Sequence, residues 1–172
     1  CGQQLKRCTL ELGGKSAAII LDDSDLEAVM SQLLPSAVLN TGQACVAQTR
    51  ILVSRGRYEE TVEALVAAVQ ALKVGDPSDE SCDIGPLFAS RHRERVESYI
   101  AVGREEGAAI AIGGGRPKGL DTGWYVEPTV FTNVDNHMRI AQEEIFGPVL
   151  VVIPYEDEAD AIAIANDSDY GL

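Results

Sequence analysis

The chain has 172 residues, which is enough for one domain with a hydrophobic core, and 45% of them are hydrophobic and 24% charged, as in soluble globular proteins. Its formal net charge is −13, from 14 basic against 27 acidic residues, so we expect no cationic surface for nucleic acid. No apolar run reaches membrane-spanning length. We therefore expect a cytoplasmic protein without a membrane partner.

The cysteines and histidines are too scattered to indicate a metal centre. The cysteines stand at positions 1, 8, 45 and 82 and form no C-x-x-C pair. His92 and His137 lie in polar stretches far in sequence from Cys45. We therefore expect that the protein binds no metal and that its thiols are reduced. We also do not expect a cysteine protease or esterase that combines Cys45 with a histidine.

Strands and helices are predicted to alternate along the chain. Apolar runs between turn signals predict strands at residues 9–12, 17–21, 51–53, 109–112, 124–131 and 149–153. Apolar residues at helical spacing predict helices at 24–40, 58–72, 89–106 and 156–165, and a helical turn at 140–144. Several strands are apolar throughout, which predicts an α/β fold with a largely parallel twisted sheet and helices on both faces.

Local signals refine this pattern. Ser24 and Glu27 have the spacing of a capping box, with Ser24 as the hydroxyl cap. Pro35 should kink the helix that follows. Pro128 indicates that its strand lies at an edge or is bent. Gly103 falls on the apolar face of its helix, where a missing side chain lets a neighbour pack closely.

Cys45 is the first candidate for chemistry. It lies in the short loop Gly42-Gln43-Ala44-Cys45, after a helix and before a strand, where a thiol can be presented at a mouth. A nucleophilic cysteine must be a thiolate, and an unperturbed thiol has a pKa of about 8.5. Activation therefore needs a base or local dipoles, and the backbone N–H of the cysteine could face an oxyanion. The alternative is a buried structural thiol.

Glu11 is the candidate base. It is flanked by Leu10 and Leu12 and followed by Gly13 and Gly14. Glycines allow a substrate or cofactor to approach closely, and a partly apolar setting makes a carboxylate a usable base. The alternative is an ordinary strand carboxylate that faces solvent.

Residues 143–148, Glu-Glu-Ile-Phe-Gly-Pro, form a third candidate. The Gly-Pro turn would hold Glu144 and Phe146 at the start of the next strand, although α/β sheets usually bind ligands at the carboxyl edge. A turn with a packed aromatic ring explains the segment equally well. Lys15 is expected to be solvated. The triple glycine at 113–115 lacks the dinucleotide-binding spacing and is interpreted as a turn.

The chain resembles the NAD(P)-dependent aldehyde dehydrogenases in three motifs. The segment Leu10-Glu11-Leu12-Gly13-Gly14-Lys15-Ser16 resembles the glutamate motif of that family. Gly42-Gln43-Ala44-Cys45 resembles its catalytic-cysteine motif. Glu144-Ile145-Phe146-Gly147-Pro148 resembles its cofactor-contact motif. Residues 127–130 and 170–172 also resemble family segments. The resemblance implies the Rossmann-like catalytic domain of that family. Residues 1–12 would be the tail of the cofactor-binding domain, and residues 13–172 a catalytic domain truncated at its C-terminus.

The resemblance also implies roles for site residues. Cys45 would attack an aldehyde to give a thiohemiacetal and then a thioester. Glu11 would activate the hydrolytic water and help to deprotonate Cys45. Glu144 would hydrogen-bond the nicotinamide ribose, with Phe146 near the ring. The nicotinamide side would be lined by Leu12 and Gly13.

The implied cofactor is NAD or NADP, whose binding domain lies outside this chain. The implied partners are a small-molecule aldehyde, the remaining domains of a longer enzyme and, for that enzyme, further copies of itself in a homo-oligomer. The isolated chain is expected to be inactive.

Two other functions stay open. In a CoA-acylating relative a thiol would replace water as the acyl acceptor, but Glu11 disfavours this because that reaction has less need of a water-activating base. A non-catalytic remnant or interaction domain could keep the same fold, but the presence of both Glu11 and Cys45 disfavours it.

Overall fold

The computed structural model describes residues 1–172 and contains one five-stranded sheet with strand order β1-β2-β5-β4-β3. The strands are β1 (Ala17–Ile20), β2 (Arg50–Ser54), β3 (Ala109–Ile112), β4 (Thr129–Thr132) and β5 (Val149–Tyr155). Neighbouring strands pair in parallel, except that β3 runs antiparallel to β4. The predicted α/β fold with a largely parallel sheet is therefore confirmed.

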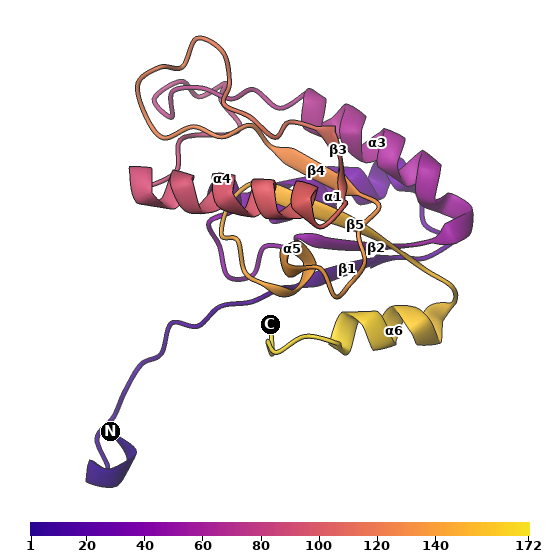
Figure 1. Cartoon of the computed structure of the whole chain (residues 1–172), viewed down its shortest axis with the longest axis horizontal. Helices are drawn as coiled ribbons and strands as arrows, with labels where there is room; N and C mark the ends of the chain where they lie inside the picture. The colour runs from indigo at the N-terminus through magenta and orange to yellow at the C-terminus, as the bar shows by residue number, and fades with distance from the viewer.

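Helices cover both faces of this sheet (Figure 1). They are α1 (Leu26–Ala37), α2 (Leu39–Gly42), α3 (Tyr58–Gln70), α4 (Ser90–Glu105), α5 (Arg139–Gln142) and α6 (Glu158–Asn166), with short 3₁₀ turns η1 (Gly2–Gln4) and η2 (Arg55–Arg57). None of these helices combines the length and the apolar character needed to cross a lipid bilayer.

Two hydrophobic cores lie on opposite faces of the sheet. Val149, Val151 and Ile153 of β5 pack in the core that includes residues of α4, α5 and α6. Leu150 and Val152 of the same strand pack in the core that includes residues of α1 and α3. Because successive side chains of a strand point to opposite faces, a strand between two helical layers must be apolar at every position.

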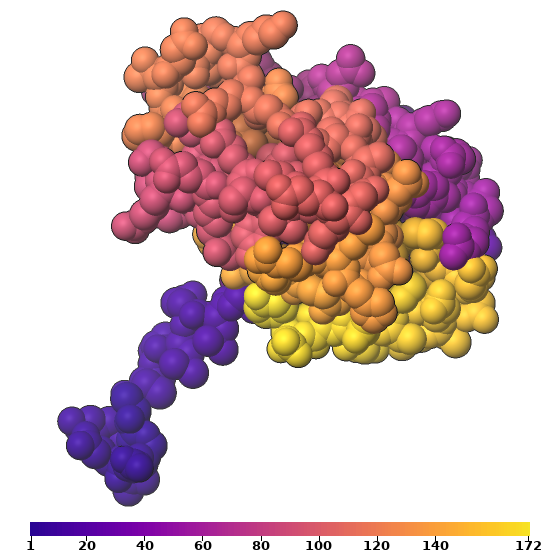
Figure 2. All heavy atoms as spheres, viewed as in Figure 1, coloured from indigo at the N-terminus to yellow at the C-terminus, as the bar shows by residue number.

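The predicted strand at 9–12 is wrong. Residues 6–16 form neither helix nor strand, and Leu10 and Leu12 are 68% and 70% exposed. Figure 2 shows the N-terminal residues as an arm that projects from the body. The apolar residues of this segment resemble a strand pattern, but no neighbouring strand is available to pair with it.

Two further local predictions need correction. The cap of α1 is Asp25, one residue after Ser24, and its carboxylate accepts hydrogen bonds from the backbone of Glu27 at 3.0 Å and Ala28 at 3.4 Å. The strand predicted at 124–131 is observed only as β4 at Thr129–Thr132, and it is an interior strand, not an edge strand. Pro128 precedes it and does not interrupt the ladder, which begins where Thr129 N donates to the Pro148 carbonyl at 2.8 Å. α1 itself continues through Pro35 to Ala37.

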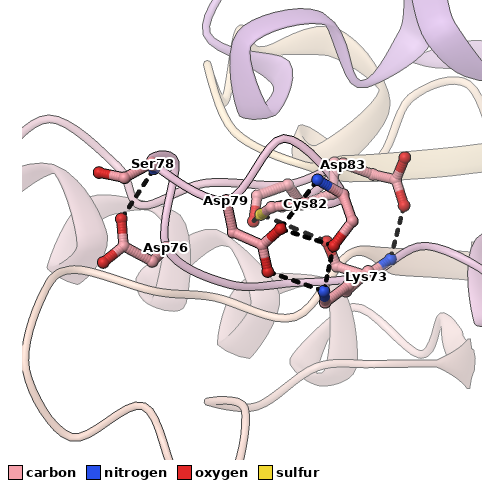
Figure 3. Close-up of polar contacts among 8 residues, drawn as sticks. Lys73, Asp76, Ser78, Asp79, Cys82 and Asp83 are labelled. Carbon is pink, nitrogen blue, oxygen red and sulfur yellow. Dashed lines mark hydrogen bonds and ion pairs between the residues drawn. The ribbon is translucent and has the colours of Figure 1, made fainter.

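The connection between α3 and α4 is ordered by Lys73 (Figure 3). Its ammonium donates to Asp79 at 2.9 Å, its backbone N–H donates to the Asp83 carboxylate at 2.8 Å, and its carbonyl accepts from Asp83 N at 2.9 Å. This loop leads directly to Gly85, whose carbonyl accepts a hydrogen bond from Thr41 Oγ1 at 3.2 Å. The loop therefore supports the turn that carries Cys45.

Gly103 provides a test of the packing between α4 and the sheet. A Cβ atom there would lie 2.9 Å from two ring carbons of Phe131 and 3.0 Å from Ile140 Cδ1, so the expected close approach is confirmed. Gly103→Val should overpack this contact and lower the free energy of unfolding by about 1–3 kcal/mol. Thermal or urea unfolding of the full-length protein measures the effect.

Gly56→Val is the matched control, because a Cβ atom at Gly56 meets nothing within 4 Å. Its effect should stay within about 0.5 kcal/mol. Equal unfolding midpoints for the two variants would contradict a tight contact between α4 and β4.

Candidate active site

Three segments that are far apart in sequence meet at one edge of the sheet. Because β1, β2 and β5 are parallel, the segments that precede them lie at the same edge. They are residues 11–14, 42–45 and 144–148 (Figure 1). This is the amino edge of the parallel strands, whereas open α/β sheets usually bind ligands beyond their carboxyl edge.

An open pocket of about 510 Å³ lies between these segments. It is lined by Glu11, Leu12, Gly13, Gln43, Ala44, Cys45, Glu144 and Phe146. Every residue that the sequence nominated for catalysis or cofactor binding thus lines this one pocket, together with Gln43 and Ala44.

Glycines allow the three segments to come this close. Cβ atoms would lie 2.5 Å from Glu144 Oε2 at Gly13, 2.5 Å from the Cys45 carbonyl oxygen at Gly14, and 2.2 Å from the Gly147 carbonyl oxygen at Gly42. Gly42 also has a φ of +71°, a conformation that favours glycine. Each pair of segments therefore makes contact where a side chain is missing.

Cys45 lies half-buried in the turn between α2 and β2, and its thiol is free. The turn begins with two left-handed residues, Asn40 at φ 50° and Thr41 at φ 62°. Asn40 Nδ2 donates to the Gln43 carbonyl at 3.2 Å, and Gln43 Nε2 donates to the Asn40 carbonyl at 2.9 Å. Gln43 Oε1 also accepts from Phe88 N at 3.0 Å. The reciprocal amide bonds hold the turn from both ends.

Glu144 lies against the glycine pair. Its Oε1 accepts a hydrogen bond from Gly14 N at 3.2 Å, and its main-chain oxygen accepts one from Arg95 Nη2 at 2.7 Å. Its backbone N–H donates to Tyr170 Oη at 3.4 Å. These contacts connect the Glu144 segment to the segment before β1, to α4 and to the last residues of the chain.

Glu143 anchors the residue before Glu144. Arg139 Nε donates to its Oε1 at 2.7 Å, and Tyr99 Oη donates to its Oε2 at 2.6 Å. The hydrogen bonds from Arg139, and then from Tyr99, lower the pKa of Glu143 to about 2. Glu143 is therefore ionised at neutral pH and ties this segment to α4 and α5.

His92 is buried, although the sequence placed it in a polar setting. Its ring stacks on Phe88 with centroids 4.7 Å apart and meets Phe146 edge-on at 5.9 Å. Its Nε2 is hydrogen-bonded to the Phe146 carbonyl oxygen. The missed signal is helical spacing: His92 lies four residues before the buried Val96 and shares its face of α4. No cluster of His, Cys, Asp and Glu side chains in the chain could hold a metal ion.

Two predicted environments differ from the structure. Glu11 lies on the extended arm at the rim of the pocket and is exposed, so this chain alone does not supply a partly apolar setting for it. Lys15 was expected to be solvated but is 2% exposed. Its backbone N–H donates to the Leu172 carbonyl at 2.8 Å and its carbonyl accepts from Arg50 Nε at 2.9 Å, which draws the side chain inward.

The fold and the pocket define an α/β protein with a cysteine-centred site flanked by carboxylates. The sequence model of the aldehyde dehydrogenase family matches residues 1–172, so the chain belongs to that family.

Named relatives agree with this assignment. The chain is 54% identical to geranial dehydrogenase of Castellaniella defragrans, matching 100% of this chain and 36% of that protein. It is 47% identical to betaine aldehyde dehydrogenase of Brucella abortus, over 99% of this chain and 36% of that protein. The chain therefore spans about a third of the length of these relatives.

Solved structures agree as well. An aldehyde dehydrogenase of Mycobacterium tuberculosis, crystallised with NAD+, superposes with a TM-score of 0.97 at 62% identity, covering 99% of this chain and 35% of that one. Betaine aldehyde dehydrogenase of Staphylococcus aureus, also with NAD+, gives a TM-score of 0.92 at 46% identity, over 94% and 32%.

The Gln43 amide should be essential for the shape of the Cys45 turn. Gln43→Leu keeps the approximate size but leaves Phe88 N–H without its partner and removes the side-chain hydrogen bond to the Asn40 carbonyl. The turn should lose about 1–3 kcal/mol of local stability. Hydrogen–deuterium exchange of the full-length protein should then be faster at the Phe88 amide.

Gln32→Leu is the control, because Gln32 is exposed on α1. It should leave exchange at Phe88 unchanged. Unaltered exchange in Gln43→Leu would show that the amide does not hold the turn.

Proposed function

We propose that this chain carries the catalytic residues of an NAD-dependent aldehyde dehydrogenase, which oxidises an aldehyde to a carboxylic acid. The observation that carries the proposal is the single pocket that Cys45, Glu11 and Glu144 line together. A nucleophile, a base and a carboxylate acceptor for cofactor hydroxyls are the groups that this reaction requires.

The relatives support the cofactor and the class of substrate. The M. tuberculosis and S. aureus enzymes were crystallised with NAD+, and an aldehyde dehydrogenase of Pseudomonas syringae was crystallised with NAD+ and octanal. The C. defragrans and Brucella relatives are named for geranial and betaine aldehyde, which differ greatly in polarity. The proposal therefore names aldehydes as a class.

The pocket residues fit a nicotinamide nucleotide. A Cβ atom at Gly13 would lie 2.5 Å from Glu144 Oε2, so a side chain there would displace that carboxylate from its place at the pocket wall. Glu144 would accept hydrogen bonds from ribose hydroxyls, Phe146 would pack near the nicotinamide ring, and Leu12 with Gly13 would form the adjoining wall. When bound, the nicotinamide supplies the hydride acceptor that converts the Cys45 adduct to a thioester.

Cys45 would form the covalent bond to the substrate. Its Sγ attacks the aldehyde carbon, and the carbonyl oxygen becomes the oxyanion of a thiohemiacetal. The backbone N–H of Cys45 makes no hydrogen bond within the chain and is available to that oxyanion.

Glu11 would act as the general base. It takes a proton from the water that hydrolyses the thioester, and it assists deprotonation of the Cys45 thiol. It lines the same pocket as Cys45 and is exposed to solvent there.

The same proposal covers the domain division and the partners. Residues 1–12 would belong to the tail of the cofactor-binding domain and residues 13–172 to the catalytic domain. Figure 2 shows the N-terminal residues as an arm that projects from the body, which supports this boundary. The partners of the full-length enzyme would be its remaining domains, a small-molecule aldehyde and further copies of itself.

Glu11→Gln tests the assignment of the base. In the full-length enzyme with NAD+ and an aldehyde, the turnover number should fall by about 10²–10⁴-fold, because hydrolysis of the thioester loses its general base. Intact-mass and peptide mass spectrometry should then detect an acyl group on Cys45.

Glu63→Gln, at an exposed position on α3, should retain full activity and accumulate no acyl-enzyme. An acyl group on another residue, or full activity of Glu11→Gln, would refute the assignment. Formation of acyl-CoA instead of free acid when CoA is supplied would identify the CoA-acylating reaction.

A further inference from the structure

Phe146 has a backbone conformation that a bulky residue rarely adopts. Its φ is 61°, in the left-handed region, and it is the only aromatic residue of the chain with a positive φ. This conformation is costly for a residue with a large side chain and persists only where surrounding contacts hold it. Phe146 also lines the pocket that contains Cys45 and Glu144. An outlier at this position therefore calls for a contact that maintains it.

His92 supplies a hydrogen bond to this residue. Its Nε2 is bonded to the Phe146 carbonyl oxygen, and no other hydrogen bond within the chain reaches the Phe146 backbone. A carbonyl oxygen only accepts, so His92 Nε2 carries a proton and donates it to this bond. The direction of the carbonyl depends on the ψ angle of Phe146. A bond that fixes the carbonyl therefore restricts the Phe146 main chain.

The His92 ring is itself fixed on two sides. It is 6% exposed, stacks on the Phe88 ring with centroids 4.7 Å apart, and meets the Phe146 ring edge-on at 5.9 Å. Phe88 N donates to Gln43 Oε1 at 3.0 Å, so the stacked ring is anchored to the turn that carries Cys45. The imidazole is therefore held between the Cys45 turn and Phe146.

Helix α4, which carries the histidine, supports the same segment at two further points. Arg95 Nη2 donates to the Glu144 carbonyl at 2.7 Å, and a Cβ atom at Gly147 would lie 2.6 Å from Val96 Cγ2. These contacts lie on either side of Phe146 in the sequence. They fix the two ends of the segment and leave the Phe146 carbonyl to the histidine.

We propose that His92 is a positioning residue whose Nε2–H holds Phe146 in its left-handed conformation, with the ring at the pocket wall that receives the nicotinamide. This inference rests on the proposed role of Phe146. Without the hydrogen bond, Phe146 relaxes toward ordinary backbone conformations, and the binding-competent conformation is less populated. The apparent affinity for NAD+ falls in proportion to that population. His92 acts through Phe146 and takes no part in the reaction itself.

The test is a double-mutant cycle on NAD+ affinity, measured by calorimetry with the full-length enzyme. His92→Phe keeps an aromatic ring but lacks the donor, and it should weaken binding about two- to tenfold, the effect of losing one hydrogen bond. Phe146→Gly removes the ring and adopts a positive φ without strain, and it should weaken binding as well. Adding His92→Phe to it should weaken binding no further, because the histidine then has no ring to position.

A conservative variant separates the hydrogen bond from a role in filling space. His92→Gln places an amide N–H near the position of Nε2 and should keep the affinity within about twofold of wild type. His137→Phe, at an exposed position, is the control and should bind like wild type. If His92→Phe fails to fold, His92→Asn, which is smaller and whose amide ends short of the Nε2 position, should show the same loss of affinity.

Each contrary result has a distinct meaning. If Phe146→Gly weakens binding and His92→Phe does not, His92 only fills space, and this inference is overturned while the proposed function stands. If the two losses add, or if His92→Gln binds as weakly as His92→Phe, His92 does not act through its hydrogen bond to Phe146, and the inference is again overturned. If Phe146→Gly binds NAD+ like wild type, the proposed role of Phe146 fails, and the inference fails with it.

Discussion

The structure depends on three close contacts, two with backbone atoms and one with a carboxylate, and each is made possible by a glycine. Gly14 lies under the Cys45 carbonyl, Gly13 lies under the Glu144 carboxylate, and Gly42 lies against the Gly147 carbonyl. Each contact joins a different pair of the three segments, so together they close a triangle around the pocket. No side chain larger than hydrogen fits at any of these positions without a shift of main chain or of the Glu144 carboxylate.

The sheet supplies the frame for this triangle. Parallel pairing of β1, β2 and β5 brings the starts of these strands to one edge, and apolar residues of β2 and β5 pack in the cores on both faces of the sheet. A rigid frame matters because the pocket walls are loops, which hold catalytic geometry only when their ends are fixed. The Gln43 amide and the bonds from Arg139 and Tyr99 to Glu143 fix these loops locally.

Much of this arrangement could be predicted from the sequence. The apolar runs of β2 and β5 indicated buried parallel strands, and Gly103 indicated the close approach of α4 to the sheet. The three motifs indicated which residues share a pocket only through their resemblance to a known family. The general rule for α/β sheets pointed to the carboxyl edge, while the pocket lies at the amino edge, because its residues precede their strands.

The sequence predictions that were wrong have physical causes, and the first two depend on residues far away in the sequence. Lys15 has polar and small neighbours in sequence, and its burial results from contacts with Arg50 and the C-terminal segment. The segment 9–12 has apolar residues but no strand to pair with. The predicted cap of α1 is Ser24 and the observed cap is Asp25, because the Asp25 carboxylate accepts hydrogen bonds from two backbone N–H groups.

A crystal structure of the full-length enzyme with NAD+ and the carboxylate product bound would test the central claim most directly. The account predicts the product next to Cys45 Sγ, Glu144 within hydrogen-bonding distance of the nicotinamide ribose, and Gly13, Gly14 and Gly42 still in contact with their partner backbones or carboxylate. A product bound at another site, or a Glu144 carboxylate turned away from the ribose, would contradict it.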